Sequence, residues 1–226
     1  MSLKTRIMLA LASCVLIGGA GCTQDFDQPD FVHDEGQPWC DELEAGTGST
    51  DCALLLGEDH LLFFEYAPAA RGTRLMVNLN TLEGQEVQSF GPIIIDGAMA
   101  SPALRDINAD EREELFIPMM TGNVNTLYSL WQQDDEGLFH RAGEVSGFDV
   151  DGFELRGGLM ITHSRGDAAT AYETASRLTV DGLGTVYEML IDYAARDCRL
   201  LDQSGLAAMQ MSAAAVVAAC ESREWE

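Results

Sequence analysis

The stretch DINADEREELFIPMMTGNVNTLYSLW, from Asp106 to Trp131, contains an acidic loop, an apolar run, a Gly-Asn turn and an aromatic-rich run, in that order. Both runs have the length and composition of β-strands, and the Gly and Asn residues between them favour a turn. The stretch therefore predicts an acidic loop that leads directly into a pair of strands.

The acidic loop places short polar side chains at alternate positions from Asp106 to Asp110, and a further acidic residue follows. Side chains with this spacing on a tight loop converge their oxygens on one point, which suits calcium because the ion takes about six to eight oxygen ligands. In the numbering of a standard calcium loop, positions 1, 3, 5, 7 and 9 are Asp106, Asn108, Asp110, the Arg112 carbonyl and Glu114. Position 6 is Glu111 rather than Gly and position 12 is Ile117 rather than Glu, which excludes a complete EF-hand loop.

The loop resembles the pattern D-x-N-x-D-G-x-x-D-L of FG-GAP and VCBS-type repeats, in which a metal loop runs directly into a strand. Glu114 replaces the last Asp of the pattern, Leu115 matches its final position, and Glu111 stands where the pattern has Gly. The resemblance implies a calcium site formed by Asp106, Asn108, Asp110, Arg112 and Glu114. The alternative is a polar turn before a strand, because Asp and Asn favour turns. The absence of Gly supports this alternative, since that position of a calcium loop often needs a left-handed conformation that only Gly adopts at low cost.

Residues 1–21 have the layout of a secretory signal, with Lys4 and Arg6 before the apolar run IMLALASCVLIGGAG. The run ends in Gly-Ala-Gly-Cys22, which resembles a bacterial lipobox and predicts lipidation of Cys22. An earlier candidate, Cys14, leaves too short an apolar core before it, and a plain secretory signal is the other alternative. By resemblance to enterobacterial sorting, Thr23 permits delivery to the outer membrane, so we expect a lipid-anchored protein of the bacterial cell envelope that faces the periplasm.

The composition after the signal is strongly acidic. Lys4 and Arg6 are two of the 13 basic residues, which leaves 11 arginines against 37 acidic residues and a charge of about −26. Nucleic acid and anionic membrane surfaces are polyanions and are therefore disfavoured as partners. Cationic proteins and divalent cations are favoured, and contact with the membrane is expected only through the lipid anchor.

Residues 22–38 are polar, acidic and contain two prolines, which is typical of a flexible tether. Residues 39–226 then form a single β-rich domain in this interpretation. Four cysteines remain in it, and an even number in an exported chain indicates disulfides. Of the three possible connectivities we favour the local pairs, Cys40–Cys52 and Cys198–Cys220.

From His60 onward, short apolar or alternating runs are separated by Gly, Pro, Asn and Asp. The runs are LLFFEYA, TRLMVNL, EVQSF, PIII, ELFIPMM, TLYSLWQQ, GLFHRAGEV, LMITHSR, YETASRLTV and TVYEMLIDYAA. Their regular spacing predicts an all-β domain. We expect it to be antiparallel and either sandwich-like or, as the resemblance to FG-GAP and VCBS repeats implies, propeller-like. The Ala-rich tail from Gly205 to Cys220 predicts a short C-terminal helix, with Ser212 as a possible N-cap where it restarts.

The likeness extends beyond the metal loop. The chain also resembles small exported bacterial proteins related to FG-GAP and VCBS repeats. The features that carry this resemblance are, in order, T-G-x-x-N-T-x-Y-x-L-W, an acidic-Gly turn, Phe139, Ser164-Arg165-Gly166 and Asp181-Gly182. This resemblance covers about residues 58–201 and is strongest from Asp106 to Phe139. Family members bind calcium, and some inhibit lysozymes or act as periplasmic immunity proteins. It therefore implies a non-enzymatic, calcium-binding inhibitor of a cationic, lysozyme-like peptidoglycan hydrolase. The competing interpretation is a calcium-stabilised structural or adhesion module.

An inhibitor needs an exposed, uncharged polar segment with an aromatic anchor to enter a carboxylate-lined cleft. The candidate contact residues are Thr121, Gly122, Asn123, Val124, Asn125 and Tyr128. Support for catalysis is thin, because His163, Ser164 and Asp167 lack any nucleophile elbow around them. The motif Asp149-Val-Asp-Gly-Phe-Glu154 is interpreted as a turn rather than a second calcium loop.

Overall fold

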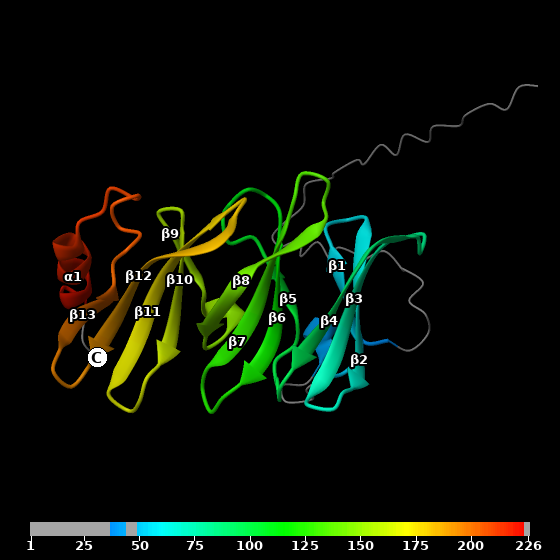
Figure 1. Ribbon diagram of the computed structural model, residues 1–226, viewed down its shortest axis with the longest axis horizontal. Helices are drawn as coiled ribbons and strands as arrows, with labels where there is room; N and C mark the ends of the chain where they lie inside the picture. The colour runs from blue at the N-terminus through cyan, green and yellow to red at the C-terminus, as the bar shows by residue number, and fades with distance from the viewer. Residues whose placement is uncertain (1–36, 44–48, 224–226) are drawn as a thin grey trace, which may run out of the picture. The chain divides into compact units, whose positions relative to one another are not determined.

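The computed structural model describes residues 37–43 and 49–223, all within one compact unit, His33–Glu226 (Figure 1). The expected signal peptide, the lipidation site Cys22 and residues 22–36 of the expected tether lie outside the described residues. Within the described part of the chain, no helix combines the length and apolar character that crossing a bilayer requires.

Three antiparallel sheets follow one another along the chain. The first contains β1 (Cys52–Leu56), β2 (His60–Pro68), β3 (Thr73–Thr81) and β4 (Glu86–Ile95) in sequence order. The second contains β5 (Ala103–Arg105), β6 (Glu114–Thr121), β7 (Thr126–Gln133) and β8 (Phe139–Gly147). The third contains β9 (Glu154–Arg156), β10 (Leu159–Arg165), β11 (Thr170–Thr179), β12 (Gly182–Asp192) and β13 (Asp197–Asp202). Two 3-10 turns, η1 (Cys40–Glu42) and η2 (Val150–Gly152), and the helix α1 (Ala213–Glu221) complete the described elements.

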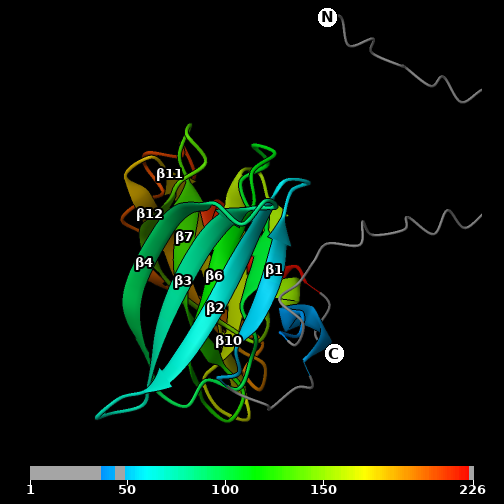
Figure 2. The same cartoon turned by 90° about the vertical axis from the view of Figure 1, so that its right-hand side faces the viewer.

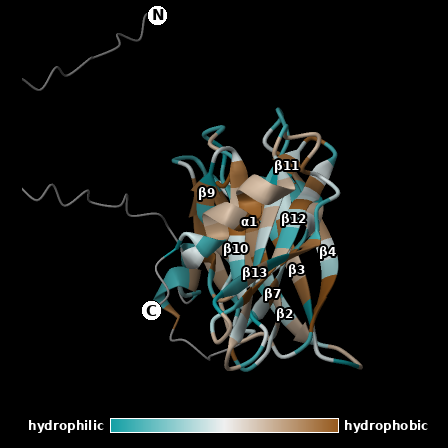
Figure 3. Cartoon of the chain, turned by 90° about the vertical axis from the view of Figure 1, so that its left-hand side faces the viewer, coloured by the Kyte–Doolittle hydropathy of each residue, from teal (hydrophilic) through white to brown (hydrophobic). Residues whose placement is uncertain are grey.

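The sheets pack face to face, with a separate apolar cluster in each interface (Figure 1). Leu62 and Val77 of the first sheet meet Leu115 of the second in one cluster, and Tyr128 of the second meets Met160 of the third in another. The other face of the third sheet is covered by α1, as Figure 3 shows. The outward face of the first sheet, seen in Figure 2, has no helix of the described residues across it.

The middle sheet explains the apolar run that follows the acidic loop. The first five residues of β6 are all buried, because alternate side chains point to opposite faces of a strand and both faces are covered here. Leu115 and Ile117 enter the cluster shared with the first sheet, whereas Phe116 enters the cluster shared with the third. Burial on both faces therefore produces a continuous apolar run rather than an alternating one.

The expected fold class is confirmed: the protein is mostly β, its sheets are antiparallel, and one short helix follows them. Two details differ from expectation. The runs EVQSF and PIII form one strand, β4, whose register shifts at the bulge opposite Leu75–Val77. Helix α1 begins only at Ala213, with Ser212 as its N-cap residue, because Leu206–Met211 form successive turns.

Both expected disulfides are present. Cys40–Cys52 joins η1 to β1, and Cys198–Cys220 joins β13 to α1. The described chain also makes contact before Trp39, because Gln37 Nε2 donates to the Cys52 carbonyl and the Pro38 carbonyl accepts from the Ala53 N–H. These bonds place the last two residues of the expected tether on the edge of the first sheet.

Candidate metal centre

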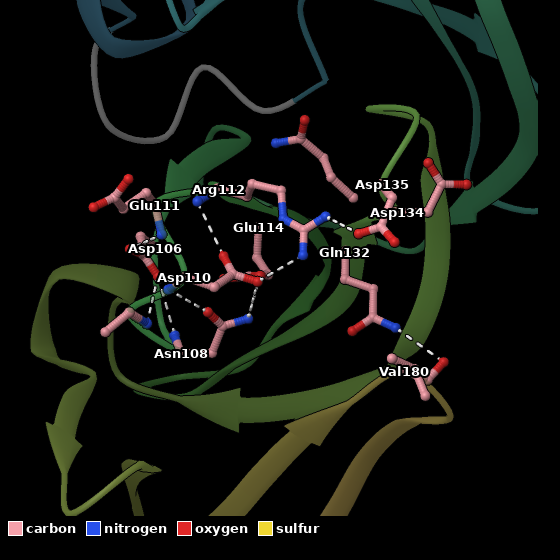
Figure 4. A network of polar contacts seen from close by, with 12 residues as sticks. Asp106, Asn108, Asp110, Glu111, Arg112, Glu114, Gln132, Asp134, Asp135 and Val180 are labelled. Carbon is pink, nitrogen blue, oxygen red and sulfur yellow. Dashed lines mark hydrogen bonds and ion pairs between the residues drawn. The ribbon is translucent and has the colours of Figure 1, made fainter.

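The acidic loop connects β5 to β6 and its two ends lie side by side. Arg105 and Glu114 are register partners in the β5–β6 ladder, so the residues that follow Arg105 return to Glu114 within one tight excursion. Figure 4 shows the loop beside the β7–β8 turn, which carries Asp134 and Asp135, with Val180 of the β11–β12 turn nearby. The short β5–β6 ladder therefore places the candidate ligands together where β5 ends and β6 begins.

The loop is held by hydrogen bonds from its own backbone to its acidic side chains. Asp106 Oδ1 accepts from Asn108 N at 3.2 Å and Ala109 N at 2.7 Å, and Asp106 Oδ2 accepts from Glu111 N at 3.1 Å. Asn108 Oδ1 accepts from Asp110 N at 2.9 Å. Such Asx turns explain why Asp and Asn alternate here.

The position where calcium loops normally have Gly keeps the Gly-like conformation. Glu111 has φ 69°, and Ala109 has φ 61°. A side chain in this left-handed region costs about 1 kcal/mol or more, and surrounding contacts must hold it there. Glu111 therefore has the left-handed backbone that Gly adopts at low cost, and this adds strain to the loop.

Glu114 is the most buried of the candidate ligands, with 1% of its surface exposed. Its Oε2 accepts from Ile107 N at 2.9 Å and its Oε1 accepts from Asn108 Nδ2 at 3.0 Å. Burial raises the pKa of Glu114 to about 7, the nearby Asp110 and Asp106 charges add to the rise, and the bond from Ile107 opposes it. Among the described residues no cationic side chain forms an ion pair with Glu114.

Asn108 and Arg112 supply the donors that face Asp110. Asn108 Nδ2 lies 3.2 Å from Asp110 Oδ2, and so it bridges the carboxylates of Asp110 and Glu114. Arg112 donates its backbone N–H to Asp110 Oδ1 at 3.0 Å and a guanidinium N–H to Asp110 Oδ2 at 3.2 Å. A second guanidinium nitrogen reaches Asp135 Oδ1 at 3.0 Å.

The structure thus brings Asn108, Asp110 and Glu114 into contact, while Asp106 points its oxygens at the loop backbone. No group of three or more His, Cys, Asp or Glu side chains in the described chain is arranged to hold a metal ion. The side chains of Asp106, Asn108, Asp110 and Glu114 can each offer an oxygen ligand of the kind that calcium takes, and the Glu114 carboxylate is desolvated. Binding would require the Asn108 amide to present its oxygen and the carboxylates to turn away from their present donors.

A cavity of about 420 Å³ opens beside the loop. Asn108, Asp110, Arg112 and Glu114 line one side of it. The other side is formed by the β7–β8 turn, where His140 Nε2 lies 2.6 Å from Asp134 Oδ2, and by Leu178–Val180. The candidate ligands therefore face a solvent-connected space rather than a closed core.

The expected partner segment lies at the opposite end of β6, roughly 25 Å from the loop at the usual rise per strand residue. Gly122 and Asn123 are exposed there. The Asn125 amide donates to the Arg165 carbonyl at 2.9 Å and accepts from the Arg165 N–H at 2.8 Å, which fixes the hairpin against β10.

The expectation for Tyr128 as an exposed aromatic anchor is wrong. Its side chain is 2% exposed and packs edge-to-face against Phe116 and Phe153 in the core between the second and third sheets. Side chains alternate between the two faces of β7, so the sequence alone allows Tyr128 to point to either face. Because both faces of the middle sheet are covered, no residue of β7 is fully exposed.

Sequence reasoning missed a group of exposed apolar side chains around this hairpin end. Phe148 and Tyr193 are 45% and 46% exposed, and with Arg165 and Asp167 they line a cavity of about 220 Å³. These residues come together through hydrogen bonds between segments distant in sequence, because Phe148 N donates to His163 O and Tyr193 N donates to Ala169 O. No local sequence signal connects these turns.

A second buried carboxylate, Glu173, lies in the third sheet. Its partners are Tyr187 Oη at 2.8 Å, His163 Nε2 at 3.2 Å and an Arg223 guanidinium nitrogen at 3.3 Å. Burial raises its pKa, but the hydrogen bonds from His163 and Tyr187 and the charges of His163 and Arg223 outweigh it, and the pKa falls to about 2. His163 is thus held in place by its contact with Glu173. Asp149 caps η2, so the motif that begins there is a turn, as expected.

Comparison of the sequence with protein-family models finds no match, and comparisons with curated proteins and with solved structures find none either.

Proposed function

We propose that this protein is an exported calcium-binding protein of the bacterial cell envelope, and that the loop from Asp106 to Glu114 is its calcium site. The observation that carries the proposal is Glu114, a carboxylate that is 1% exposed, close to two other carboxylates and without a cationic partner among the described residues. Burying an unpaired charge is costly, and a bound cation relieves that cost. The Asx turns and the left-handed Glu111 support it, because they already give the loop its shape.

Thermal unfolding with calcium or with chelator tests this proposal. Extracellular calcium modules often have dissociation constants of about 0.1 to 1 mM. At ten times that constant, binding to the folded state adds about 1.4 kcal/mol, or roughly 4 °C in Tm for a chain of this size. Asp106→Ala and Glu114→Gln should abolish the rise, whereas Asp197→Ala, an exposed carboxylate at the start of β13, should retain it. A wild-type Tm that ignores calcium would end the proposal.

The anchoring part of the proposal concerns Cys22, which we infer to be the lipidated first residue of the mature chain. Cys22→Ser should abolish lipid labelling and release the protein from the membrane fraction. Labelling that survives this change and disappears with Cys14→Ser would identify the earlier cysteine instead.

A second candidate function is inhibition of a cationic, lysozyme-like peptidoglycan hydrolase. The observation that favours it is the hairpin end of the middle sheet, where several large apolar side chains are exposed at the end of β6 and on nearby turns. They are Met99, Met120, Val124, Phe148 and Tyr193, with exposures of 42–55%. Exposed apolar and aromatic side chains on a fixed hairpin are typical of protein-binding surfaces, and the acidic chain would speed association with a basic enzyme at low salt.

A muramidase assay against several lysozyme classes tests this second function. Inhibition should weaken with salt and with Asn123→Ala, Tyr193→Ala or Val124→Ala. Val180→Ala is the matched control, because Val180 is 94% exposed in the β11–β12 turn, beside the acidic loop and away from this hairpin. If no enzyme is slowed at micromolar protein, the calcium-stabilised structural or adhesion module becomes the better interpretation.

A further inference from the structure

Arg112 occupies an unusual place, because it is a cation attached to the proposed calcium site itself. Its backbone N–H and its guanidinium together take both oxygens of Asp110, a candidate ligand. The same guanidinium reaches across to Asp135 of the β7–β8 turn. Glu114, the other carboxylate that Asn108 bridges, has no such cation among the described residues.

The surroundings make this arginine distinctive. Among the described residues, four carboxylates line the cavity beside the loop, those of Asp110, Glu114, Asp134 and Asp135, and Arg112 is the one arginine that lines it with them. Residues 22–226 contain only 11 arginines against 37 acidic residues. The contacts are of moderate strength, since 39% of the Arg112 side chain and 36% of the Asp110 side chain are exposed.

We infer that Arg112 is an intramolecular competitor of calcium: its guanidinium holds Asp110 and must leave that carboxylate when the ion binds. This inference rests on the proposed calcium site. The displaced guanidinium can keep its contact with Asp135, because this carboxylate is 99% exposed and lies on the side of the arginine away from Asp110. Arg112 thereby stabilises the loop without calcium and weakens the affinity for the ion.

Calcium titration by calorimetry, on the soluble chain at about 0.1 M salt, tests the inference. Arg112→Gln should bind calcium about five-fold more tightly, the effect of losing one exposed ion pair at the upper end of its range. Arg112→Lys keeps the charge and should stay within about two-fold of the wild type. Arg156→Gln is the matched control, because it removes an exposed arginine, paired with Glu154 at 2.7 Å in the third sheet, with the same change in net charge. It should leave the affinity unchanged.

A second readout separates competition from a merely structural role. In chelator, Arg112→Gln should lower Tm slightly, and calcium should then raise Tm more than it does for the wild type. A variant that loses stability without gaining affinity, or that binds as the wild type does, overturns the inference and leaves calcium binding intact. Absence of binding by the wild type and by Arg112→Gln alike overturns the calcium site itself, and the inference with it.

Discussion

Glu114 and Glu173 are both buried carboxylates, with 1% and 2% of their surface exposed, yet their surroundings are opposite in charge. Glu173 has an arginine, a histidine and a tyrosine hydroxyl against it, and its pKa falls to about 2. Burial raises the pKa of Glu114 to about 7, and two further carboxylates add to the rise. One carboxylate is compensated within the protein, whereas the other is the group that an external cation would compensate.

The largest effect is expected for Glu173→Gln. Removing this buried carboxylate leaves Arg223 and His163, which are 27% and 25% exposed, without it, and we expect a cost of about 3 kcal/mol, at the lower end of the range for broken buried ion pairs. Denaturant unfolding should show this loss. Glu154→Gln removes an exposed carboxylate of the same sheet, 52% exposed and paired with Arg156, and should change stability by less than about 0.5 kcal/mol. Equal effects of the two substitutions would contradict the assignment of Glu173 as an internally compensated charge.

Acid unfolding provides the second test. The pKa of Glu173 is about 2 when folded and about 4.5 when unfolded, so the unfolded chain binds the proton more readily. Its contribution is therefore fully present above pH 4.5 and disappears as the pH falls towards 2, with a loss of roughly 3 kcal/mol at most. The wild type should lose stability across this window, and Glu173→Gln should show a flatter profile there.

The disulfide Cys198–Cys220 joins β13 to α1, and Arg223, a partner of Glu173, lies just after that helix. Replacing both cysteines by Ser should cost about 3 kcal/mol for a loop of this size in the chain-entropy model. If the disulfide holds Arg223 in place, the acid transition of the double variant should also begin at higher pH. An unchanged transition would show that Arg223 keeps its position without the disulfide.

Glu114→Gln is expected to behave differently from Glu173→Gln. Gln has one acceptor oxygen, so it loses one of the two hydrogen bonds that Glu114 accepts from Ile107 and Asn108. In chelator, removal of the buried charge offsets this loss, and the free energy of unfolding should change by less than about 1 kcal/mol. The calcium-dependent rise in Tm should disappear in the same variant. A loss as large as that of Glu173→Gln would show that Glu114 is already compensated within the protein.

The sequence predicted the parts of this comparison that local spacing determines. The strands β7 and β10 match their apolar runs residue for residue, and the candidate loop follows from alternate Asp and Asn residues. The apolar runs did not predict the strands β1, β5 and β9. Strand β5 has only three residues and exists because it pairs with β6, which no local pattern reveals.

Non-local packing also explains the errors at the candidate sites. The exposure of Tyr128 depended on which faces of the middle sheet are covered, and this follows only from the stacking of the three sheets. The compensation of Glu173 depends on Arg223, 50 residues further along the chain. The gathering of Phe148, Arg165 and Tyr193 likewise depends on turns from three hairpins or loops that meet only after folding.

The smallest expected effect concerns Glu111, which has a left-handed backbone (φ 69°) at the position where calcium loops normally have Gly. Glu111→Gly relieves strain of about 1 kcal/mol but gives the unfolded chain more freedom, so a net stabilisation of about 0.5 kcal/mol is expected. Glu83→Gly is the matched control, because Glu83 precedes Gly84 in the β3–β4 turn and is not among the residues with positive φ. That change should destabilise by about 0.5 to 1 kcal/mol. Opposite signs for the two substitutions, measured in chelator, would establish that the loop holds its calcium-loop shape before any ion binds. A loss in both would mean that residue 111 adopts the left-handed conformation only with the ion, and the pre-formed loop would then no longer support the calcium site.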